Sequence, residues 1–486
     1  MKKTIYTKII VISIGLCVLP LISNANDIRG SIITKDNKIV AQSINEKIRD
    51  YPFNTMFEPM LGYLYNDMSG AKGLEKHSED MLKKGFNLHL NIPYAFQRKV
   101  EMMLDYKTTQ LDADEIIVGV MESDTGKVLS LASTKRYDPS HVTQEDIPAL
   151  NPKVAQYPYE PGSVIGPIAT SIALDKGLVT PNQSFDTFGG KLQVGENDWI
   201  TDDEEFDSLT VADIIVHSSN IGTAQVAWTL TGKEFRDGLV KFGLAQPSGI
   251  DLSPDSPGEL KSLRLLNNQM HRANSSYGYG MLVTPVQLLK AYSAFNNDGV
   301  TVTPRLVNYL EDEKGRRYIP EPKINDAQAI SKKTSNQMHN ILLEVVKRGY
   351  GAKAQHPGLE IGGKTGTAQI AKNGRYVREY HSSFYGFAND EFGHKYTIGV
   401  LVIRAKKKYK YFASQSAAPT FKNLVKILVE EGKLIPNAEA NKKIQEEEML
   451  DTVADENKTM EGVADAIINK KGFRQTCSMS HKLYFT

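Results

Sequence analysis

The chain of 486 residues is 41% hydrophobic and 24% charged, the composition of an ordinary globular protein with room for two or three domains. Its 58 basic and 57 acidic residues leave a formal net charge of +1, so composition argues against nucleic acid or another polyanion as the partner. With 2 cysteines and 10 scattered histidines, the sequence predicts no disulfide framework, no metal site and no cofactor.

Residues 1–25 predict an export signal. Lys2 and Lys3 precede an apolar run over residues 9–22, whose length suits the core of a signal peptide and is short for a membrane span. Small residues end the run, so we expect cleavage after Ala25, with a retained membrane anchor as the alternative. Either outcome places the rest of the chain outside the cytoplasmic membrane.

Residues 26–112 predict a small N-terminal region. Strands are expected over residues 28–33 and 87–93, followed by a helix over residues 93–106 that carries its apolar residues on one face. Residues 115–133 then predict a β-hairpin, because two apolar runs flank an Asp-Thr-Gly-Lys turn. We expect this hairpin to open the second, larger domain.

The rest of the chain predicts helices first and strands later. Apolar periodicity and capping residues indicate helices over residues 168–174, 210–217, 221–230, 284–295 and 336–347. Strands return before a last helix over residues 421–431, and they cover residues 361–370, 383–388 and 396–403. This order predicts an α+β fold in which helices flank an antiparallel sheet. We expect one domain over residues 113–435 and a mobile charged tail over residues 436–486.

The turn Tyr-Glu-Pro-Gly-Ser at residues 159–163 places Ser163 at the start of an apolar helix that ends before Gly177. A helix start offers free N–H groups and partial positive charge, which suits a nucleophile that must stabilise an oxyanion. The simpler alternative is that Ser163 only caps the helix.

Two further segments carry chemistry that complements Ser163. Ser218 and Asn220 belong to a Ser-Ser-Asn sequence between two predicted helices, and Lys364 opens a Lys-Thr-Gly-Thr sequence on a predicted strand. Acyl transfer needs a nucleophile, a proton shuttle and an oxyanion hole. Ser218 near Lys364 can carry a proton to a leaving amine, and Asn220 can hold a peptide carbonyl.

The Lys-Thr-Gly strand also predicts how a substrate binds. Gly366 has no side chain, so a substrate backbone can lie along the strand edge formed by Thr365, Gly366 and Thr367. The N–H groups of Ser163 and Thr367 are the candidate oxyanion hole.

In this order, the three segments resemble the penicillin-binding, serine D,D-transpeptidase family over roughly residues 28–432. Arg29 and Gly30 are similar to the N-terminal motif of the class B, monofunctional branch. Four further segments agree with the family, at residues 277–280, 283–285, 383–388 and 417–419. The resemblance implies the fold of the penicillin-binding transpeptidases and serine β-lactamases, with residues 26–112 as a pedestal.

The resemblance also implies a function at the periplasmic face of the bacterial inner membrane. A family member cross-links stem peptides in cell-wall synthesis or division, through an acyl-enzyme on the residue that matches Ser163. Stem peptides ending in D-Ala-D-Ala and β-lactams are the implied ligands, and a membrane glycan polymerase is the implied partner.

The chain departs from the family pattern at Gly166, where the family has the lysine of Ser-x-x-Lys. That lysine lies one helical turn from the serine, and its neutral amine takes the hydroxyl proton. Lys176 lies about 20 Å further along the helix axis, Lys153 needs an unusual loop path, and Lys364 is expected to stay charged. Losing a positioned base typically slows a reaction by about 10² to 10⁴, so we predict an intact site with impaired acylation. The alternatives are a sequence error or an engineered change at this position.

Two other functions compete with an impaired transpeptidase. The first is a non-catalytic relative that serves as a scaffold in a cell-wall synthesis complex. The second is a β-lactamase or sensor on the same fold, which the N-terminal region argues against because such proteins need no pedestal. His217 is interpreted as a packing residue, and residues 202–205 are predicted to form a solvated loop.

Overall fold

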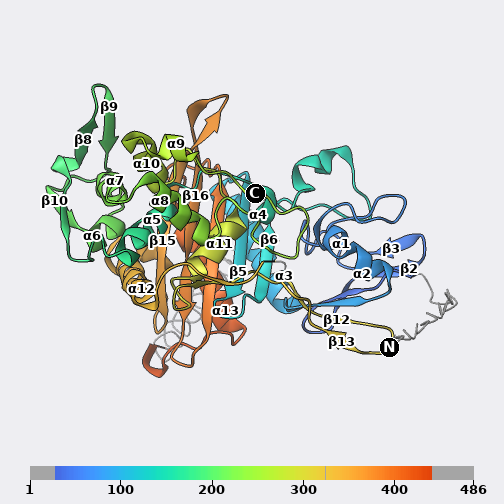
Figure 1. Cartoon of the computed structure of the whole chain (residues 1–486). Coiled ribbons are helices and arrows are strands. Elements are labelled where there is room, and N and C mark those ends of the chain that lie inside the picture. The colour runs from blue at the N-terminus through green and yellow to red at the C-terminus, as the bar shows by residue number, and fades with distance from the viewer. Residues whose placement is uncertain (1–27, 323, 441–486) are drawn as a thin grey trace, which may run out of the picture.

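The computed structural model describes residues 28–322 and 324–440. A large α+β domain lies beside a smaller N-terminal region, which holds the N-terminal end of the described chain (Figure 1). The predicted export signal and the predicted tail beyond residue 440 lie outside the described residues. Within the described ranges, no helix has both the length and the apolar character needed to cross a membrane.

The large domain is built on a five-stranded antiparallel sheet in the order β15-β16-β17-β5-β6. Its strands are β5 (Glu115–Glu122), β6 (Val128–Ser133), β15 (Glu360–Lys372), β16 (Arg375–Asn389) and β17 (Lys395–Ile403). The predicted fold class, an antiparallel sheet flanked by helices, is confirmed. Because β15 is the last strand of the sheet, one of its edges is left unpaired by strands.

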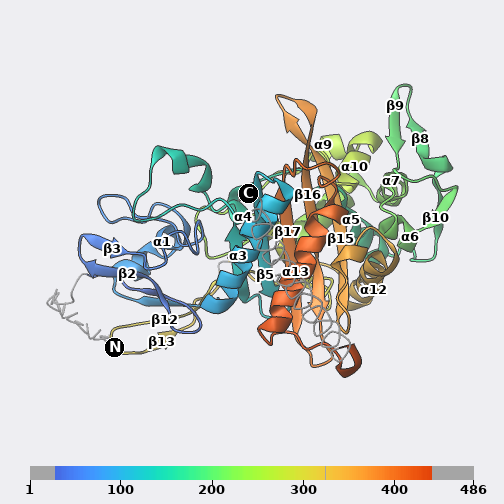
Figure 2. The same ribbon diagram turned by 180° about the vertical axis from the view of Figure 1, so that it is seen from behind.

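Both faces of this sheet are buried, which explains the continuous apolar run of β5. Successive strand residues point to opposite faces, so Ile117 and Val118 enter two different cores. Helix α11 (Pro285–Ser293) covers the first face, where Leu289 packs beside Gly119. Helices α3 (Tyr94–Leu111) and α13 (Ala417–Glu430) cover the opposite face, as Figure 2 shows from behind.

The remaining helices of the large domain lie mainly beyond β15 and α11 (Figure 1). They are α4 (Lys153–Gln156), α5 (Gly166–Asp175), α6 (Val211–Val216), α7 (Asn220–Trp228), α8 (Gly232–Lys241), α9 (Leu263–Leu266), α10 (Gln269–Ser276) and α12 (Lys332–Arg348). Three two-stranded ribbons accompany them: β7 (Ser184–Asp186) with β10 (Ser208–Thr210), β8 (Lys191–Val194) with β9 (Asp198–Thr201), and β11 (Val300–Thr301) with β14 (Ala327–Gln328).

Helix boundaries follow the capping residues. The side chains of Thr210, Thr284 and Ser331 accept hydrogen bonds from backbone N–H groups in the first turns of α6, α11 and α12. Helix α3 is longer than the predicted helix over residues 93–106. Its last turn continues through polar residues because Leu111 is buried against the large sheet.

The N-terminal region forms a six-stranded sheet in the order β13-β12-β4-β1-β2-β3. Its elements are β1 (Ile32–Ile33), β2 (Ile39–Asn45), β3 (Ile48–Asp50), α1 (Gly73–His77), α2 (Glu79–Lys83), β4 (Asn87–Leu90), β12 (Val307–Glu311) and β13 (Arg317–Tyr318). Strands β12 and β13 come from the middle of the chain, so a segment that follows α11 of the large domain completes the sheet of the N-terminal region. The boundary near residue 112 remains a prediction.

A buried ion cluster holds the start of the N-terminal region. The Glu75 carboxylate is fully buried and accepts hydrogen bonds from Arg29 Nε at 2.7 Å and from Arg49 Nε at 2.8 Å. Because a buried charge is stable only when it is paired, these three residues depend on one another. Arg29, singled out in the sequence, therefore has a structural role.

Candidate active site

Ser163 lies in a short 3₁₀ helix, Gly162–Ile165, that leads directly into α5. The predicted helix start is thus a 3₁₀ turn followed by the α-helix. Val164 and Ile165 are buried, whereas Ser163 is partly exposed. The hydroxyl of Tyr292 on α11 donates a hydrogen bond of 2.6 Å to the carbonyl of Val164, and this bond ties the Ser163 turn to α11.

The Ser163 turn packs closely against strand β15, and two glycines permit the approach. A Cβ placed on Gly162 would lie 3.1 Å from the Cβ of Ala368, and one on Gly366 would lie 2.8 Å from the Pro161 carbonyl oxygen. The backbone φ of Gly162 is +65°, a value that L side chains rarely adopt. The sequence motif containing Gly366 therefore lies beside the predicted nucleophile.

Lys364 connects β15 to the Ser-Ser-Asn loop. Its Nζ donates hydrogen bonds to Ser218 Oγ at 2.8 Å and to the Thr365 carbonyl at 3.2 Å. Lys364 is 1% exposed, and burial lowers its pKa to about 7. The neutral amine is therefore substantially populated near pH 7, in contrast to the expectation that Lys364 stays charged.

The Ser-Ser-Asn loop is held by Asp202, which the sequence interpretation missed. Ser219 Oγ donates to one carboxylate oxygen of Asp202 at 2.5 Å, and the Ile221 N–H donates to the other at 3.0 Å. The prediction of a solvated loop is wrong for Asp202, which is partly buried. No local pattern marks its role, because its partners lie almost twenty positions later in the chain.

His217 directly precedes the Ser-Ser-Asn sequence, and Asn220 is its last residue. The side-chain amide of Asn220, the first residue of α7, donates to the Thr201 carbonyl at 2.9 Å. A substrate carbonyl would compete with that bond. The His217 ring packs against Phe206 in a tilted arrangement, with 4.6 Å between ring centroids, and its Nδ1 lies 3.2 Å from Glu204 Oε2. These contacts agree with the packing role expected for His217.

The predicted substrate strand lies at the free edge of the sheet. Thr365 and Gly366 are buried, Thr367 is partly exposed, and all three belong to β15. The hydroxyl of Thr367 accepts a hydrogen bond of 3.0 Å from the Ala413 N–H, so the loop before α13 also meets this edge.

Gly166 begins α5 and faces the helices that flank the Ser-Ser-Asn loop. A Cβ built on Gly166 would lie 3.6 Å from Ile215 Cδ1 and 3.9 Å from Thr223 Oγ1, which are ordinary contact distances. The backbone φ of Gly166 is −50°, so the conformation accepts any L residue. The position can therefore take a side chain without displacing its neighbours at the Cβ atom.

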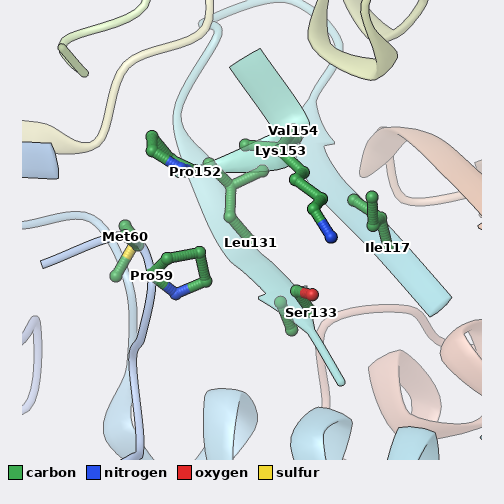
Figure 3. A pocket seen from close by; sticks show the side chains of 9 residues that line it. Pro59, Met60, Ile117, Leu131, Ser133, Pro152, Lys153 and Val154 are labelled. Atoms are coloured by element: carbon green, nitrogen blue, oxygen red, sulfur yellow. The ribbon is translucent and has the colours of Figure 1, made fainter. Parts of the chain in front are cut away.

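Each of the two lysines weighed in the sequence as a substitute base is paired with a carboxylate elsewhere. Lys153 forms an ion pair with Glu115, and Lys176 lies 3.2 Å from Glu234. Figure 3 shows the Lys153 side chain between Leu131 and Ile117, in a pocket that Pro59 and Met60 of the N-terminal region also line. That pocket offers only about 10 Å³, too little for more than a water molecule.

The described residues contain no group of three or more His, Cys, Asp and Glu side chains placed to hold a metal ion. The site thus consists of a hydroxyl on a short helix, a lysine–serine pair and an unpaired strand edge. That set of groups, on a five-stranded antiparallel sheet flanked by helices, is the combination that a serine acyl-transfer site of the penicillin-binding type requires.

Residues 116–426 match the family described as the penicillin-binding protein transpeptidase domain. The chain belongs to this family, and the predicted fold and family are confirmed. It is 25% identical over 426 residues to the peptidoglycan D,D-transpeptidase FtsI of Buchnera aphidicola, covering 82% of this chain and 72% of the relative.

Solved structures agree with this assignment. The apo form of penicillin-binding protein 3 from Mycobacterium tuberculosis is 27% identical and superposes with a TM-score of 0.77, covering 84% of this chain and 97% of that one. The same protein complexed with ampicillin gives a TM-score of 0.76 at 27% identity, covering 84% and 96% of the two chains. The similarity thus extends through the N-terminal region as well as the large domain.

Proposed function

We propose that the protein is a class B penicillin-binding protein of the peptidoglycan D,D-transpeptidase type, with acylation at Ser163 impaired by Gly166. The observation that carries the proposal is the hydrogen bond between Lys364 and Ser218 beside the Ser163 turn. Three segments that are far apart in the chain thereby meet at one strand edge. The family assignment and the similarity to a relative named as a peptidoglycan D,D-transpeptidase support the reaction type.

In the proposed reaction, a stem peptide ending in D-Ala-D-Ala pairs with the free edge of β15 at Thr365, Gly366 and Thr367. Ser163 Oγ attacks the carbonyl carbon of the penultimate residue, and the N–H groups of Ser163 and Thr367 stabilise the oxyanion. The C–N bond then breaks, and Ser218 donates the proton that D-Ala needs to leave as an amine. An acceptor amine later attacks the Ser163 ester and releases the cross-linked product.

The step that this chain performs poorly is the removal of the proton from Ser163. Gly166 provides no amine, so within the described residues the Lys364–Ser218 pair is the candidate proton acceptor near the turn. The lowered pKa of Lys364, about 7, gives it a neutral fraction that can accept the proton slowly through Ser218. Asn220 must exchange its bond to Thr201 for a bond to the substrate carbonyl.

The proposed location is the periplasmic face of the inner membrane, reached through the predicted export signal, with a membrane glycan polymerase as the partner. The ampicillin complex of the similar mycobacterial protein supports β-lactams as ligands here. A non-catalytic scaffold remains the alternative function, because the fold is complete without the missing amine.

Mass spectrometry of the intact protein after incubation with a β-lactam tests the proposal. We expect slow addition of one drug mass to wild type and no addition to Ser163→Ala. Complete absence of the adduct in both wild type and Gly166→Lys would contradict acylation and favour the scaffold. The same spectrum reports whether residues 1–25 have been removed.

A further inference from the structure

A pocket of about 320 Å³ lies in the N-terminal region, at the edge of the buried ion cluster that contains Arg29. It is enclosed by the start of the described chain, the β2–β3 hairpin, the loop before α1 and helix α2. The residues that line it are Arg29, Ser43, Asn45, Glu46, Met68 and Lys83. We call this set of residues the Arg29 pocket.

The Arg29 pocket contains buried donors that find no acceptor within the described chain. Arg29 is 5% exposed; its Nε and Nη2 pair with Glu75 and Glu79, whereas its Nη1 has no partner among the described residues. Arg49 repeats this pattern, because its Nη1 lies 3.3 Å from Ser43 Oγ while its buried Nη2 is also without an acceptor in the described ranges. Unsatisfied buried donors are rare, and two on neighbouring guanidinium groups indicate a missing acceptor.

The charges around the Arg29 pocket favour an anionic ligand. Lys83 adds an ammonium group that is 53% exposed and lies 2.7 Å from Glu79 Oε1. Asn45 Oδ1 accepts the Lys47 N–H at 2.9 Å, so the NH₂ group of Asn45 is left as a donor. Glu46 is a lining carboxylate, but it is exposed and can turn into water when an anion binds. Phosphate oxygens suit this set, because guanidinium and ammonium groups bind them through charge-assisted hydrogen bonds.

Exposed apolar side chains flank the Arg29 pocket on the β2–β3 hairpin. Ile44 and Ile48 are 58% and 53% exposed, and they lie on either side of the turn at residues 46–47. The same hairpin supplies Ser43 and Asn45 to the pocket, so apolar and polar groups share one projecting tip. Exposed apolar side chains beside cationic groups are typical of a protein surface that enters the head-group region of a membrane.

The position of the hairpin also fits a membrane surface. β2 and β3 lie at the end of the molecule opposite the large domain, as Figures 1 and 2 both show. The described chain begins at Ile28, three residues after the predicted cleavage site at Ala25. If the apolar run is retained as an anchor, the seven residues from Ile22 to Arg29 span at most about 25 Å. Either outcome of export therefore brings the Arg29 pocket to the membrane surface.

We propose that the Arg29 pocket binds the head-group phosphate of an anionic phospholipid while the β2–β3 tip enters the membrane surface. The unpaired Nη1 of Arg29 and the Lys83 ammonium hold the phosphate oxygens, and Ile44 and Ile48 contact the apolar part of the lipid layer. The apolar tip favours a lipid over free phosphate as the occupant. The inference rests on the location given under the proposed function and is independent of the acylation chemistry. It gives the N-terminal region a membrane contact that persists after the export signal has been removed.

Co-sedimentation with lipid vesicles tests the proposal, using the chain that begins at Asn26 because this form carries no export signal. One set of vesicles contains equal parts of phosphatidylglycerol and phosphatidylcholine, and the other contains phosphatidylcholine alone. We expect affinity for the first set to be about tenfold or more higher, and to fall as salt is added. Equal binding to both sets, or binding to neither, overturns the proposal. Calorimetric binding of inorganic phosphate without vesicle binding would show a free-anion site and would overturn the lipid assignment.

Variants separate the Arg29 pocket from general attraction to a charged surface. Lys83→Gln should weaken binding to the anionic vesicles about fivefold, the effect of one lysine at such a surface. Glu46→Gln removes the opposing carboxylate and should strengthen binding, and Ile44→Asn should weaken binding to vesicles without affecting the fold, because Ile44 is exposed. Lys38→Gln, at an exposed lysine at the other end of β2, is the matched control and should change binding little. Equal effects of Lys83→Gln and Lys38→Gln would contradict a role for the pocket.

Covalent labelling of Gly166→Lys with a fluorescent penicillin distinguishes failure of this proposal from failure of the proposed function. Labelling at Ser163 without vesicle binding overturns only the lipid contact. Selective binding to anionic vesicles without labelling overturns the acyl-transfer function and still supports the Arg29 pocket as a lipid site.

Discussion

Lys364 Nζ lies 2.8 Å from Ser218 Oγ and donates a hydrogen bond to it, although the lysine is almost completely buried. No ion pair accompanies the ammonium within the described residues, so burial alone lowers its pKa, to about 7. Under the proposed function, in which Gly166 leaves the site without its usual base, we expect this amine to decide how acylation depends on pH.

The first prediction concerns the pH dependence of residual acylation. A neutral amine accepts protons, so labelling of wild type by a fluorescent penicillin should rise with pH through the Lys364 pKa of about 7. Lys364→Arg keeps the positive charge at every accessible pH. This variant should label more slowly than wild type and lose the rise. An identical pH profile in wild type and Lys364→Arg would contradict a role for Lys364 as base.

The second prediction concerns the stability cost of the same residue. Because burial lowers the folded-state pKa of Lys364 to about 7 from its ordinary value of 10.5, the unfolded chain holds the proton more tightly. The cost of burying the charged amine is therefore absent above pH 10.5, and it lowers the free energy of unfolding progressively as the pH falls towards about 7. Lys364→Met should stabilise the protein at neutral pH by about 1 kcal/mol or more, raising Tm by about 1–2 °C per kcal/mol. Thermal unfolding of Lys364→Met and wild type measures this, and a lower Tm would contradict it.

The third prediction concerns Asp202. Asp202→Asn weakens the bonds from Ser219 Oγ and the Ile221 N–H, which fix the start of α7 beside Ser218. We expect a loss of about 1–2 kcal/mol in the free energy of unfolding. Penicillin labelling in the Gly166→Lys background should also slow. Asp203→Asn, at the exposed neighbouring position, is the control, and equal labelling rates for both variants would rule out a positioning role for Asp202.

The fourth prediction concerns the N-terminal region. Glu75→Gln leaves Arg49 without its buried counter-charge and leaves Arg29 with Glu79 as its remaining ion-pair partner, and breaking a buried pair costs about 3–5 kcal/mol. We expect a much lower urea midpoint than for Glu46→Gln, an exposed carboxylate of the same region. A midpoint shift no larger than that of the control would show that the cluster contributes little.

The large sheet could be predicted because its strands carry local signals. The apolar run of β5 and its Gly126 turn predict the hairpin, and the Lys-Thr-Gly strand predicted over residues 361–370 lies within β15 (Glu360–Lys372). The meeting of Ser218 with Lys364 followed from the family resemblance, since no local pattern relates residues so far apart in the chain.

Other features depend on contacts that no local pattern encodes. β12 and β13 join the N-terminal sheet through pairing with β4, more than two hundred residues earlier, and their residues are mostly polar or half-exposed. The lowered pKa of Lys364 arises from burial by segments distant in the sequence. Asp202 lay within an acidic run that is typical of a solvated loop, and only the folded chain brings Ser219 to it.

The central claim is that the amine missing at Gly166 limits acylation of Ser163. The space around Gly166 accepts a Cβ, so Gly166→Lys should fold and direct a side chain toward α6 and α7. The most direct test is the second-order rate constant of labelling by a fluorescent penicillin, measured for wild type and Gly166→Lys. We predict an increase of about 10² to 10⁴ in Gly166→Lys, lost when Ser163→Ala is added. Equal rate constants in a folded Gly166→Lys protein would contradict the claim.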